Sequence, residues 1–312
     1  MEIFREELKD RLGKNLAFDL LLKDYTTIGT GGIADYYYVA EKIDDLINAV
    51  TVAHRLNIPY LIIGSGSNIV FSDMGYKGLV IRNNTHNIVI NQDTGEVIAD
   101  SGVIVSKLLN QVASNNLGGI EFMAGIPGTL GGAIYGNAGS GSLYIGDYVK
   151  SITFLDKVAG ELKMVTRPHT WMEFSYRSTK LKRQHKEDFR PLILTAHIRM
   201  SQKRYDEILK NIQDYIQLRK EKQPLNEKSC GSFFKNPGKL PEQAAGYLLD
   251  RSGAKKLRVG GAAVSKKHAN FIINQKDASS ADIKKVADKA KQLVFDNYDI
   301  SLEEEIEYFG DW

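Results

Sequence analysis

The sequence predicts an α+β protein with about two domains. In roughly the first 200 residues, short strands rich in β-branched residues are mixed with two helices, without the regular alternation of a parallel βαβ series. After about residue 201 the pattern is typical of long amphipathic helices. The chain has 312 residues, about twice the usual domain size of roughly 150. We therefore expect a domain boundary near residue 201.

The first 200 residues predict their elements in a clear order. Apolar residues at helical spacing indicate helices, and short β-branched runs between glycine or asparagine residues indicate strands. The second helix leads into the longest glycine-rich stretch, so that we expect this stretch to follow directly on a helix. The expected elements are a strand at 34–40, a helix at 41–57, strands at 59–64 and 78–83, a strand pair at 87–91 and 95–100, and a helix at 104–117.

The residues after 201 predict two long helices. Along the first helix, 204–222, the apolar residues that recur at spacings of three and four are Ile208, Ile212, Tyr215 and Ile216. The second helix, about 280–296, is expected to begin at Ser279 or Ser280 as N-cap. Its predicted buried face consists of Ile283, Val286, Ala287, Ala290 and Val294. The charged stretch LKRQHKEDFR at 181–190 predicts a solvated loop.

The composition indicates a globular protein without a disulfide framework. Hydrophobic residues make up 43% of the chain and charged residues 25%, close to the averages of folded domains. The net charge of +3 favours neither a nucleic acid nor a membrane surface as partner. A single cysteine excludes cysteine-rich metal sites. The charged N-terminus and the lack of a long apolar run predict a cytoplasmic protein.

Three glycine turns favour a dinucleotide cofactor. They are GTGG at 29–32, GSGSN at 64–68 and AGIPGTLGGAIYGNAG at 124–139. Glycine lets the backbone approach a ligand and turn its N–H groups toward phosphate oxygens. GTGGIA fits the dinucleotide fingerprint formally, but a strand follows it where a helix is required, which excludes a Rossmann site. Each turn taken alone is also compatible with a plain connection between strands.

Seven segments resemble, in order, the UDP-N-acetylenolpyruvoylglucosamine reductase family. They are TTIGTGGIADYYYVAE, LIIGSGSNIVFSD, AGIPGTLGGAIYGNAG, FSYRSTKLK, GSFFKNP, VGGAAVSKKHANFIIN and LEEEIEYFG, which together span about residues 25–310. The resemblance implies NADPH-dependent, FAD-mediated reduction of UDP-N-acetylglucosamine enolpyruvate to UDP-N-acetylmuramate in peptidoglycan precursor synthesis. The short connection from Arg177 to Ser232 resembles the family type that lacks a tyrosine-bearing insertion.

The resemblance also implies a domain organisation. An FAD-binding domain of two α+β subdomains, similar to that of vanillyl-alcohol-oxidase-like flavoproteins, would occupy residues 1–200, with subdomains at about 1–85 and 86–200. A smaller α+β substrate-binding domain would occupy residues 201–300. The C-terminal residues 301–312 would pack back on the FAD-binding domain. We expect a monomer whose partners are NADPH and the nucleotide sugar.

Three catalytic residues follow from the resemblance. Arg177 in FSYRSTK matches the family's catalytic arginine, whose guanidinium can hold a carboxylate by two hydrogen bonds. Ser232 in GSFFKNP matches the residue that protonates the carbanion. Aligning Leu302–Glu305 with the family's Leu-Glu-Pro-Glu block assigns the catalytic glutamate to Glu305, although Glu304 replaces the proline. Chemical reasoning alone does not choose among the four acids of this segment.

The resemblance extends to ligand contacts. The substrate contacts that it implies are Tyr176, Lys222, Asn236 and His268. The implied contacts to FAD are Gly64, Ser65, Gly66, Ser67, Asn68, Gly125, Ile126, Pro127, Gly128, Thr129, Gly131, Gly132 and Asn137. No Cys or His lies within 25–35 or 118–146, which favours non-covalent FAD, and this chemistry requires no metal. Cys230 is interpreted as a packing residue that shares a face with Ser232 if 230–234 is extended.

Two other functions stay open at this point. The first is a flavin-dependent oxidase of the related fold, in which a His or Cys near the glycine turns often holds the flavin covalently. The second is a non-catalytic nucleotide-sugar binding protein. The presence of Arg177, Ser232 and Glu305 together argues against the second function.

Overall fold

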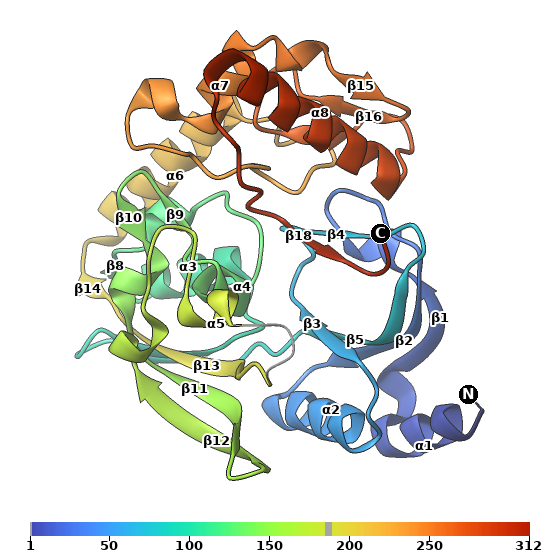
Figure 1. Cartoon of the computed structure of the whole chain (residues 1–312). Coiled ribbons are helices and arrows are strands. Elements are labelled where there is room, and N and C mark those ends of the chain that lie inside the picture. Colours follow the sequence, from blue (N-terminus) through green and yellow to red (C-terminus); the bar gives the residue numbers. More distant parts are fainter. Residues whose placement is uncertain (1, 185–188) are drawn as a thin grey trace. The chain divides into compact units, whose positions relative to one another are not determined.

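The computed structural model describes residues 2–184 and 189–312, in which helices alternate with mostly short strands (Figure 1). The α-helices are α1 (Glu2–Leu12), α2 (Ile43–Arg55), α3 (Val105–Ser114), α4 (Leu130–Tyr135), α5 (Lys180–Arg183), α6 (Tyr205–Lys222), α7 (Ala245–Arg251) and α8 (Ser280–Tyr298). The longer strands are β1 (Leu16–Leu21), β2 (Ile33–Ala40), β3 (Tyr60–Ile63), β5 (Tyr76–Asn83), β6 (Ile88–Asn91), β7 (Glu96–Asp100), β11 (Val149–Val158), β12 (Glu161–Pro168) and β13 (Leu192–Arg199). The strands of two or three residues are β4 (Ile69–Phe71), β8 (Leu117–Gly118), β9 (Gly139–Ser140), β10 (Leu143–Tyr144), β14 (Ser201–Gln202), β15 (Arg258–Val259), β16 (Ala262–Val264), β17 (Ile272–Asn274) and β18 (Glu307–Phe309).

The chain divides into two compact units. The first comprises Met1–Leu16, Tyr38–Gly64 and Ile81–Leu218. The second comprises Ala17–Tyr37, Ser65–Val80 and Arg219–Trp312. Strands β1, β2, β5 and β3 form a four-stranded sheet in this order.

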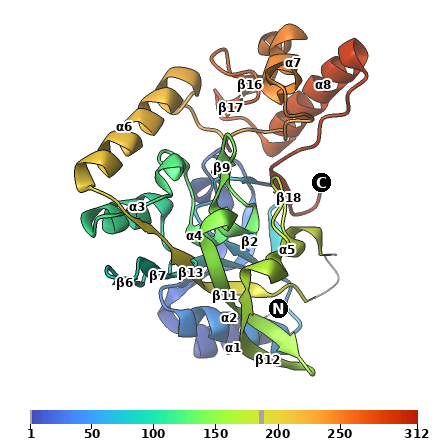
Figure 2. The same cartoon turned by 90° about the vertical axis from the view of Figure 1, so that its left-hand side faces the viewer.

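An antiparallel sheet of five strands, in the order β12-β11-β13-β7-β6, forms the centre of the first unit. Helices α3 and α4 lie over one face of this sheet (Figure 2). Their buried side chains, among them Leu108 and Ile134, form one core with strand residues such as Phe154 and Ile198. Along β7, side chains alternate between this core, which contains Val97 and Ala99, and the opposite face, where Ile98 is exposed. The core therefore fixes the loops that connect β7 to α3 and α3 to α4.

The C-terminal part of the second unit packs helices α7 and α8 against the sheet β15-β16-β17. Helix α8 begins at Ser279, whose side chain accepts a hydrogen bond from the N–H of Asp282, while Asp282 accepts one from the N–H of Ser279. In the same unit, β18 pairs in parallel with β4, so residues 69–71 and 307–309 lie side by side (Figure 1). The final residues are thereby fixed to an early segment of the chain.

Most sequence-predicted elements are confirmed. The helices predicted at 41–57, 104–117, 204–222 and 280–296 correspond to α2, α3, α6 and α8. The predicted strand pair is the antiparallel pair β6–β7. Ser279 is the N-cap of α8, and all five residues predicted for its inner face are buried.

Two expectations about local structure are wrong, and one helix was not predicted. The glycine-rich stretch at 124–139 does not follow directly on α3, because β8 and the short 3-10 helix Glu121–Met123 lie between them. It also contains helix α4, which begins at Thr129 as N-cap. The predicted loop at 181–190 begins inside α5, where Leu181 is buried; residues 185–188 of this prediction lie outside the described residues.

Candidate active site

Two of the predicted cofactor loops meet within the first unit. A Cβ added to Gly64 would lie 2.5 Å from Oγ1 of Thr129, so that a side chain at position 64 would collide with the loop before α4. In that loop Gly125 has φ +75° and Gly128 has φ +132°, conformations that favour glycine. The N–H of Ile126 is donated to Met123, whereas those of Gly125 and Gly128 have no acceptor within the described part of the chain. The loop can therefore present backbone amides to an anionic ligand.

The rest of the second loop lies in the second unit. Gly66 is buried with φ +65°, and its carbonyl accepts the N–H of Thr27. Asn68 donates its side-chain amide to the carbonyl of Glu305 at 3.1 Å, and its own carbonyl accepts the N–H of Glu307. Gly64–Asn68 thus supplies a constrained turn whose last residue holds the C-terminal segment.

The glycines of the third turn, GTGG at 29–32, pack closely against the protein. A Cβ on Gly31 would lie 2.9 Å from the Cβ of Phe71, and one on Gly32 would overlap the backbone of Asp73. We interpret this turn as structural, because its glycines are required by neighbouring protein atoms.

Arg177 lies in a tight turn of the first unit, in a left-handed conformation. The N–H of Ser175 is donated to the carbonyl of Ser178 at 3.0 Å, and the N–H of Ser178 to that of Ser175 at 3.2 Å. Arg177, the third residue of this turn, has φ +52°. A position of this kind favours glycine, and a non-glycine residue costs about 1–3 kcal/mol there. The chain therefore has an arginine at a position whose backbone conformation favours glycine.

The Arg177 guanidinium is half-buried and directed at two backbone carbonyls. It donates to the carbonyl of Asn137 at 3.4 Å and to that of Gly139 at 3.1 Å. Asn137 is buried; its side chain donates to the carbonyl of Ser175 at 2.9 Å and accepts the N–H of Gly146. Tyr176 is exposed, and the Arg177 guanidinium lies 5.7 Å from its ring centre. The structure thus brings Arg177, Tyr176 and Asn137 together.

Ser232 and Glu305 adjoin two paired segments of the second unit. The N–H of Glu305 is donated to the carbonyl of Phe233 at 2.8 Å, and Phe234 pairs with Glu304 in an antiparallel bridge. Buried Asn270 accepts the N–H of Phe234 at 2.9 Å and donates to its carbonyl at 2.8 Å through its side chain. Its backbone carbonyl accepts the N–H of Phe233. Ser232, directly before Phe233, is half-buried on this frame.

The structure separates the neighbouring acids that the sequence left equivalent. Glu303 forms an ion pair with Lys235, which lies opposite it across the paired segments. Glu304 forms one with Lys291 of α8 at 3.2 Å. The backbone of Glu305 is bonded to Phe233 and to the side chain of Asn68. Glu303 and Glu304 are thus each paired with a lysine from a distant part of the sequence.

Cys230 is a core residue, as the sequence predicts. It is buried among the apolar residues of the second unit, and burial raises the pKa of its thiol to about 12. Gly231 has φ +80°, so the extended conformation assumed for 230–234 is not present. The condition under which Cys230 and Ser232 would share a face is therefore not met, and a thiol with this pKa is a poor nucleophile.

The remaining predicted substrate contacts all lie in the second unit. Lys222 is exposed at the end of α6, and Asn236 is exposed with its side chain accepting the N–H of Ala245. His268 is half-buried against Gly246, and its Nδ1 accepts the N–H of Asn270. Burial lowers the pKa of His268, and the nearby Lys255 lowers it further. His268 is connected through Asn270 to the Ser232 segment.

Comparison with known proteins finds matches that include residues of both units. A model of the C-terminal domain of UDP-N-acetylenolpyruvoylglucosamine reductase matches residues 223–309, and a model of an FAD-binding domain matches residues 34–166. The UDP-N-acetylenolpyruvoylglucosamine reductase of Caldicellulosiruptor saccharolyticus is 34% identical, over 97% of this chain and 94% of its own length. That of Caldanaerobacter subterraneus is 36% identical over 99% of both chains.

The chain belongs to the UDP-N-acetylenolpyruvoylglucosamine reductase family. The crystal structure of the reductase from Thermus caldophilus matches with a TM-score of 0.76 and 29% identity, covering 93% of this chain and 98% of that one. These matches confirm the predicted fold, an FAD-binding α+β domain followed by a smaller C-terminal domain.

The residues of the first unit fit the FAD that the family fold implies. Gly125 and Gly128 adopt positive φ, and their N–H groups have no acceptor within the described part of the chain, so the amides at 125 and 128 can face phosphate oxygens. In residues 2–184 and 189–312, no three His, Cys, Asp or Glu side chains are grouped as metal ligands. No helix among these residues is both long and apolar enough to cross a membrane.

One residue of this family member's site, Asn270, was missed from the sequence, and a second contact of Asn137 was not foreseen. Asn270 lies two positions after His268 in the block KKHANF, in which only the histidine is predicted to contact a ligand. Asn137, which the resemblance assigns to the cofactor, also donates its side-chain amide to the turn that contains Arg177. An asparagine at positive φ, as at 137, is a signal for such a local role, but φ is not visible in a sequence.

Proposed function

We propose that this chain catalyses the NADPH-dependent, FAD-mediated reduction of UDP-N-acetylglucosamine enolpyruvate to UDP-N-acetylmuramate in peptidoglycan precursor synthesis. The observation that carries the proposal is the family membership over nearly the whole chain, with an arginine retained at the strained position 177. Strain of this kind is typical of functional sites. We also propose that the protein acts in the cytoplasm as a monomer, with an FAD-binding domain at 1–200 and a substrate-binding domain at 201–300.

When bound, FAD would supply the hydride chemistry that links NADPH to the enolpyruvyl double bond. We assign its binding to Gly64–Asn68, Gly125–Thr129, Gly131, Gly132 and Asn137. Backbone amides of the Gly125–Gly128 turn would hold the diphosphate. The buried Cys230, with its raised pKa, is unsuited to covalent attachment, which supports non-covalent binding.

Arg177 is assigned to the substrate carboxylate. Addition of hydride to the double bond places negative charge on the carbon next to that carboxylate. A guanidinium paired with the carboxylate stabilises the charge as it develops, because the donors are already positioned. The exposed Tyr176, beside Arg177, is assigned to the same substrate.

Ser232 is assigned as the proton donor. The carbanion is a far stronger base than an alkoxide, so transfer of the hydroxyl proton from Oγ to carbon is downhill. Hydride and proton together saturate the double bond. Glu305, whose N–H is bonded to the carbonyl of Phe233, is assigned as a second acidic group. Three further residues are assigned to the nucleotide sugar: Lys222, Asn236 and His268.

An anaerobic absorption titration tests this function. The purified protein should be yellow, lose its flavin absorbance on adding NADPH, and regain it on adding the enolpyruvyl substrate. A nucleotide-sugar binding protein without catalysis would keep its absorbance with NADPH. Acid should release FAD and leave a colourless pellet, whereas a pellet that stays yellow would contradict non-covalent binding.

A further inference from the structure

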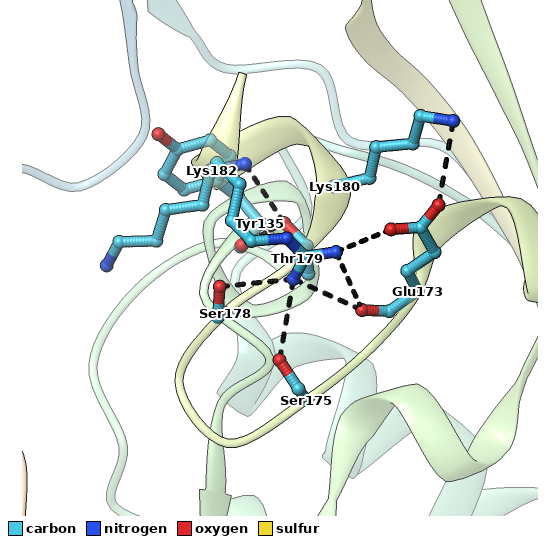
Figure 3. A network of polar contacts seen from close by, with 8 residues as sticks. Tyr135, Glu173, Ser175, Ser178, Thr179, Lys180 and Lys182 are labelled. Carbon is cyan, nitrogen blue, oxygen red and sulfur yellow. Dashed lines mark hydrogen bonds and ion pairs between the residues drawn. The ribbon is translucent and has the colours of Figure 1, made fainter. Parts of the chain in front are cut away.

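Arg183, the last residue of α5, bridges both ends of the loop that contains Arg177. Its guanidinium donates to the Glu173 carboxylate at 2.7 Å and to the Glu173 carbonyl at 3.3 and 3.4 Å. It also reaches Oγ of Ser178 at 3.3 Å and Oγ of Ser175 at 3.5 Å. Glu173, Ser175 and Ser178 converge on this one position (Figure 3). One side chain therefore spans residues 173–178.

The bridged loop contains two residues in left-handed conformations. Glu173 has φ +48° and Arg177 has φ +52°, although neither is glycine. Local backbone preference opposes both conformations, so contacts from outside the loop must maintain them. Arg183 binds the carbonyl and carboxylate of Glu173 and the side chain next to Arg177.

The helix that carries Arg183 is itself anchored. Thr179, the N-cap of α5, is fully buried; its Oγ1 donates to the carbonyl of Tyr135 at 2.8 Å and accepts the N–H of Lys182 at 3.3 Å. Lys180 adds an ion pair with Glu173 at 3.7 Å. Arg183 thus extends from an anchored helix to the strained loop.

We propose that Arg183, paired with Glu173, is a positioning residue that holds the turn Ser175–Ser178 and thereby the guanidinium of Arg177. The inference rests on the proposed assignment of Arg177 to the substrate carboxylate. The competing interpretation is an ordinary surface ion pair, since the side chains of Arg183 and Glu173 are 44% and 57% exposed. Such pairs contribute little to stability and nothing specific to one catalytic step.

The two interpretations differ in the half-reaction that they affect. Arg177 would act on the enolpyruvyl substrate, so misplacing it should slow flavin reoxidation by substrate and spare flavin reduction by NADPH. Arg183→Ala should reduce the reoxidation rate by about 10- to 10²-fold, since a 1 Å misplacement of a catalytic group can cost about 10²-fold. Arg183→Lys should restore part of the rate, because it keeps the charge but loses the planar fork. Glu173→Gln should give a smaller loss in the same step.

A double-mutant cycle with Arg177 tests the proposal in anaerobic stopped-flow experiments. If Arg183 acts through Arg177, adding Arg183→Ala to Arg177→Ala should change the reoxidation rate less than about 2-fold. Arg204→Ala, which removes a more exposed ion pair with Asp206 in the same unit, is the matched control and should leave both steps unchanged. If Arg183→Ala does not fold, the same cycle is run with Arg183→Lys and Glu173→Gln.

The outcomes separate this proposal from the function on which it rests. If Arg177→Ala leaves reoxidation unchanged, the role of Arg177 itself is wrong. If Arg177→Ala slows reoxidation while Arg183→Ala has no effect, slows both steps alike, or multiplies the effect of Arg177→Ala, only the positioning role is overturned.

Discussion

Arg177 lies in a tight turn at positive φ, held by side chains of Asn137 and Arg183 from elsewhere in its unit. Ser232 and Glu305 instead adjoin extended segments joined by backbone hydrogen bonds, with Asn270 bonded to both backbone groups of Phe234. The first arrangement holds an arginine side chain in a strained turn. The second holds Ser232 and Glu305 next to extended, hydrogen-bonded segments. Substitutions that relax the Arg177 turn should therefore raise stability while they lower activity. Substitutions that disrupt the segments around Ser232 should lower both.

The largest expected effect on stability comes from Asn270. Asn270→Ala removes the partners of the N–H and carbonyl of buried Phe234 and should lower the free energy of unfolding by about 3 kcal/mol. Urea denaturation measures the change. Asn297→Ala, which removes an exposed bond from the Asn297 side chain to Leu293 on α8, is the control and should change stability by less than about 0.5 kcal/mol. Equal effects of the two variants would mean that Asn270 does not hold this frame.

A comparison of two substitutions at Arg177 measures the strain in its turn. Arg177→Ala and Arg177→Gly both lose the contacts to Asn137 and Gly139, but only alanine keeps a Cβ at φ +52°. The glycine variant should be more stable than the alanine variant by about 1 kcal/mol. Both should be equally slow with the enolpyruvyl substrate. An alanine variant as stable as the glycine variant would show that the left-handed conformation relaxes without cost.

A smaller effect is expected from the titration of His268. Burial and Lys255 lower its folded-state pKa below the unfolded value of about 6.5, with Asp250 opposing. As the pH falls below about 6.5, His268 binds a proton in the unfolded chain but not yet in the folded chain. The free energy of unfolding therefore decreases. His268→Asn keeps an acceptor near the position of Nδ1 and should lose less stability between pH 7.5 and 5.5. An identical loss in urea midpoint for the variant and the original protein would contradict this.

Much of the fold could be predicted because it depends on local patterns. The apolar period of α6 and α8, the Ser279 cap and the pair β6–β7 are each specified by neighbouring residues. Helix α4 was missed because its sequence, LGGAIY, has a low helix propensity and its stability depends on the Thr129 cap and on the core. Contacts between distant segments override the local preference there.

For the candidate site, too, contacts between distant segments limited what could be predicted. Its residues were assigned through resemblance to a family, and chemistry alone could not choose among the acids of 303–307. The ion pairs of Glu303 with Lys235 and of Glu304 with Lys291 join segments distant in sequence, which no local pattern encodes. The positive φ of Arg177 was equally hidden, since arginine normally disfavours it. Asn270 acts on Phe234, 36 positions away.

The most direct test of the account measures the two half-reactions of Ser232→Ala by anaerobic stopped flow. Reduction of the flavin by NADPH needs no proton donor to carbon and should be nearly unchanged. Its reoxidation by the enolpyruvyl substrate should slow by about 10²–10⁴-fold, the usual cost of losing a positioned acid. Ser232→Cys should recover part of the rate, because a thiol is also a proton donor. Ser301→Ala, which changes an exposed serine of the same unit, should leave both steps unchanged. Equal slowing of both steps in Ser232→Ala, or an unchanged second step, would contradict the assignment of Ser232 as the proton donor.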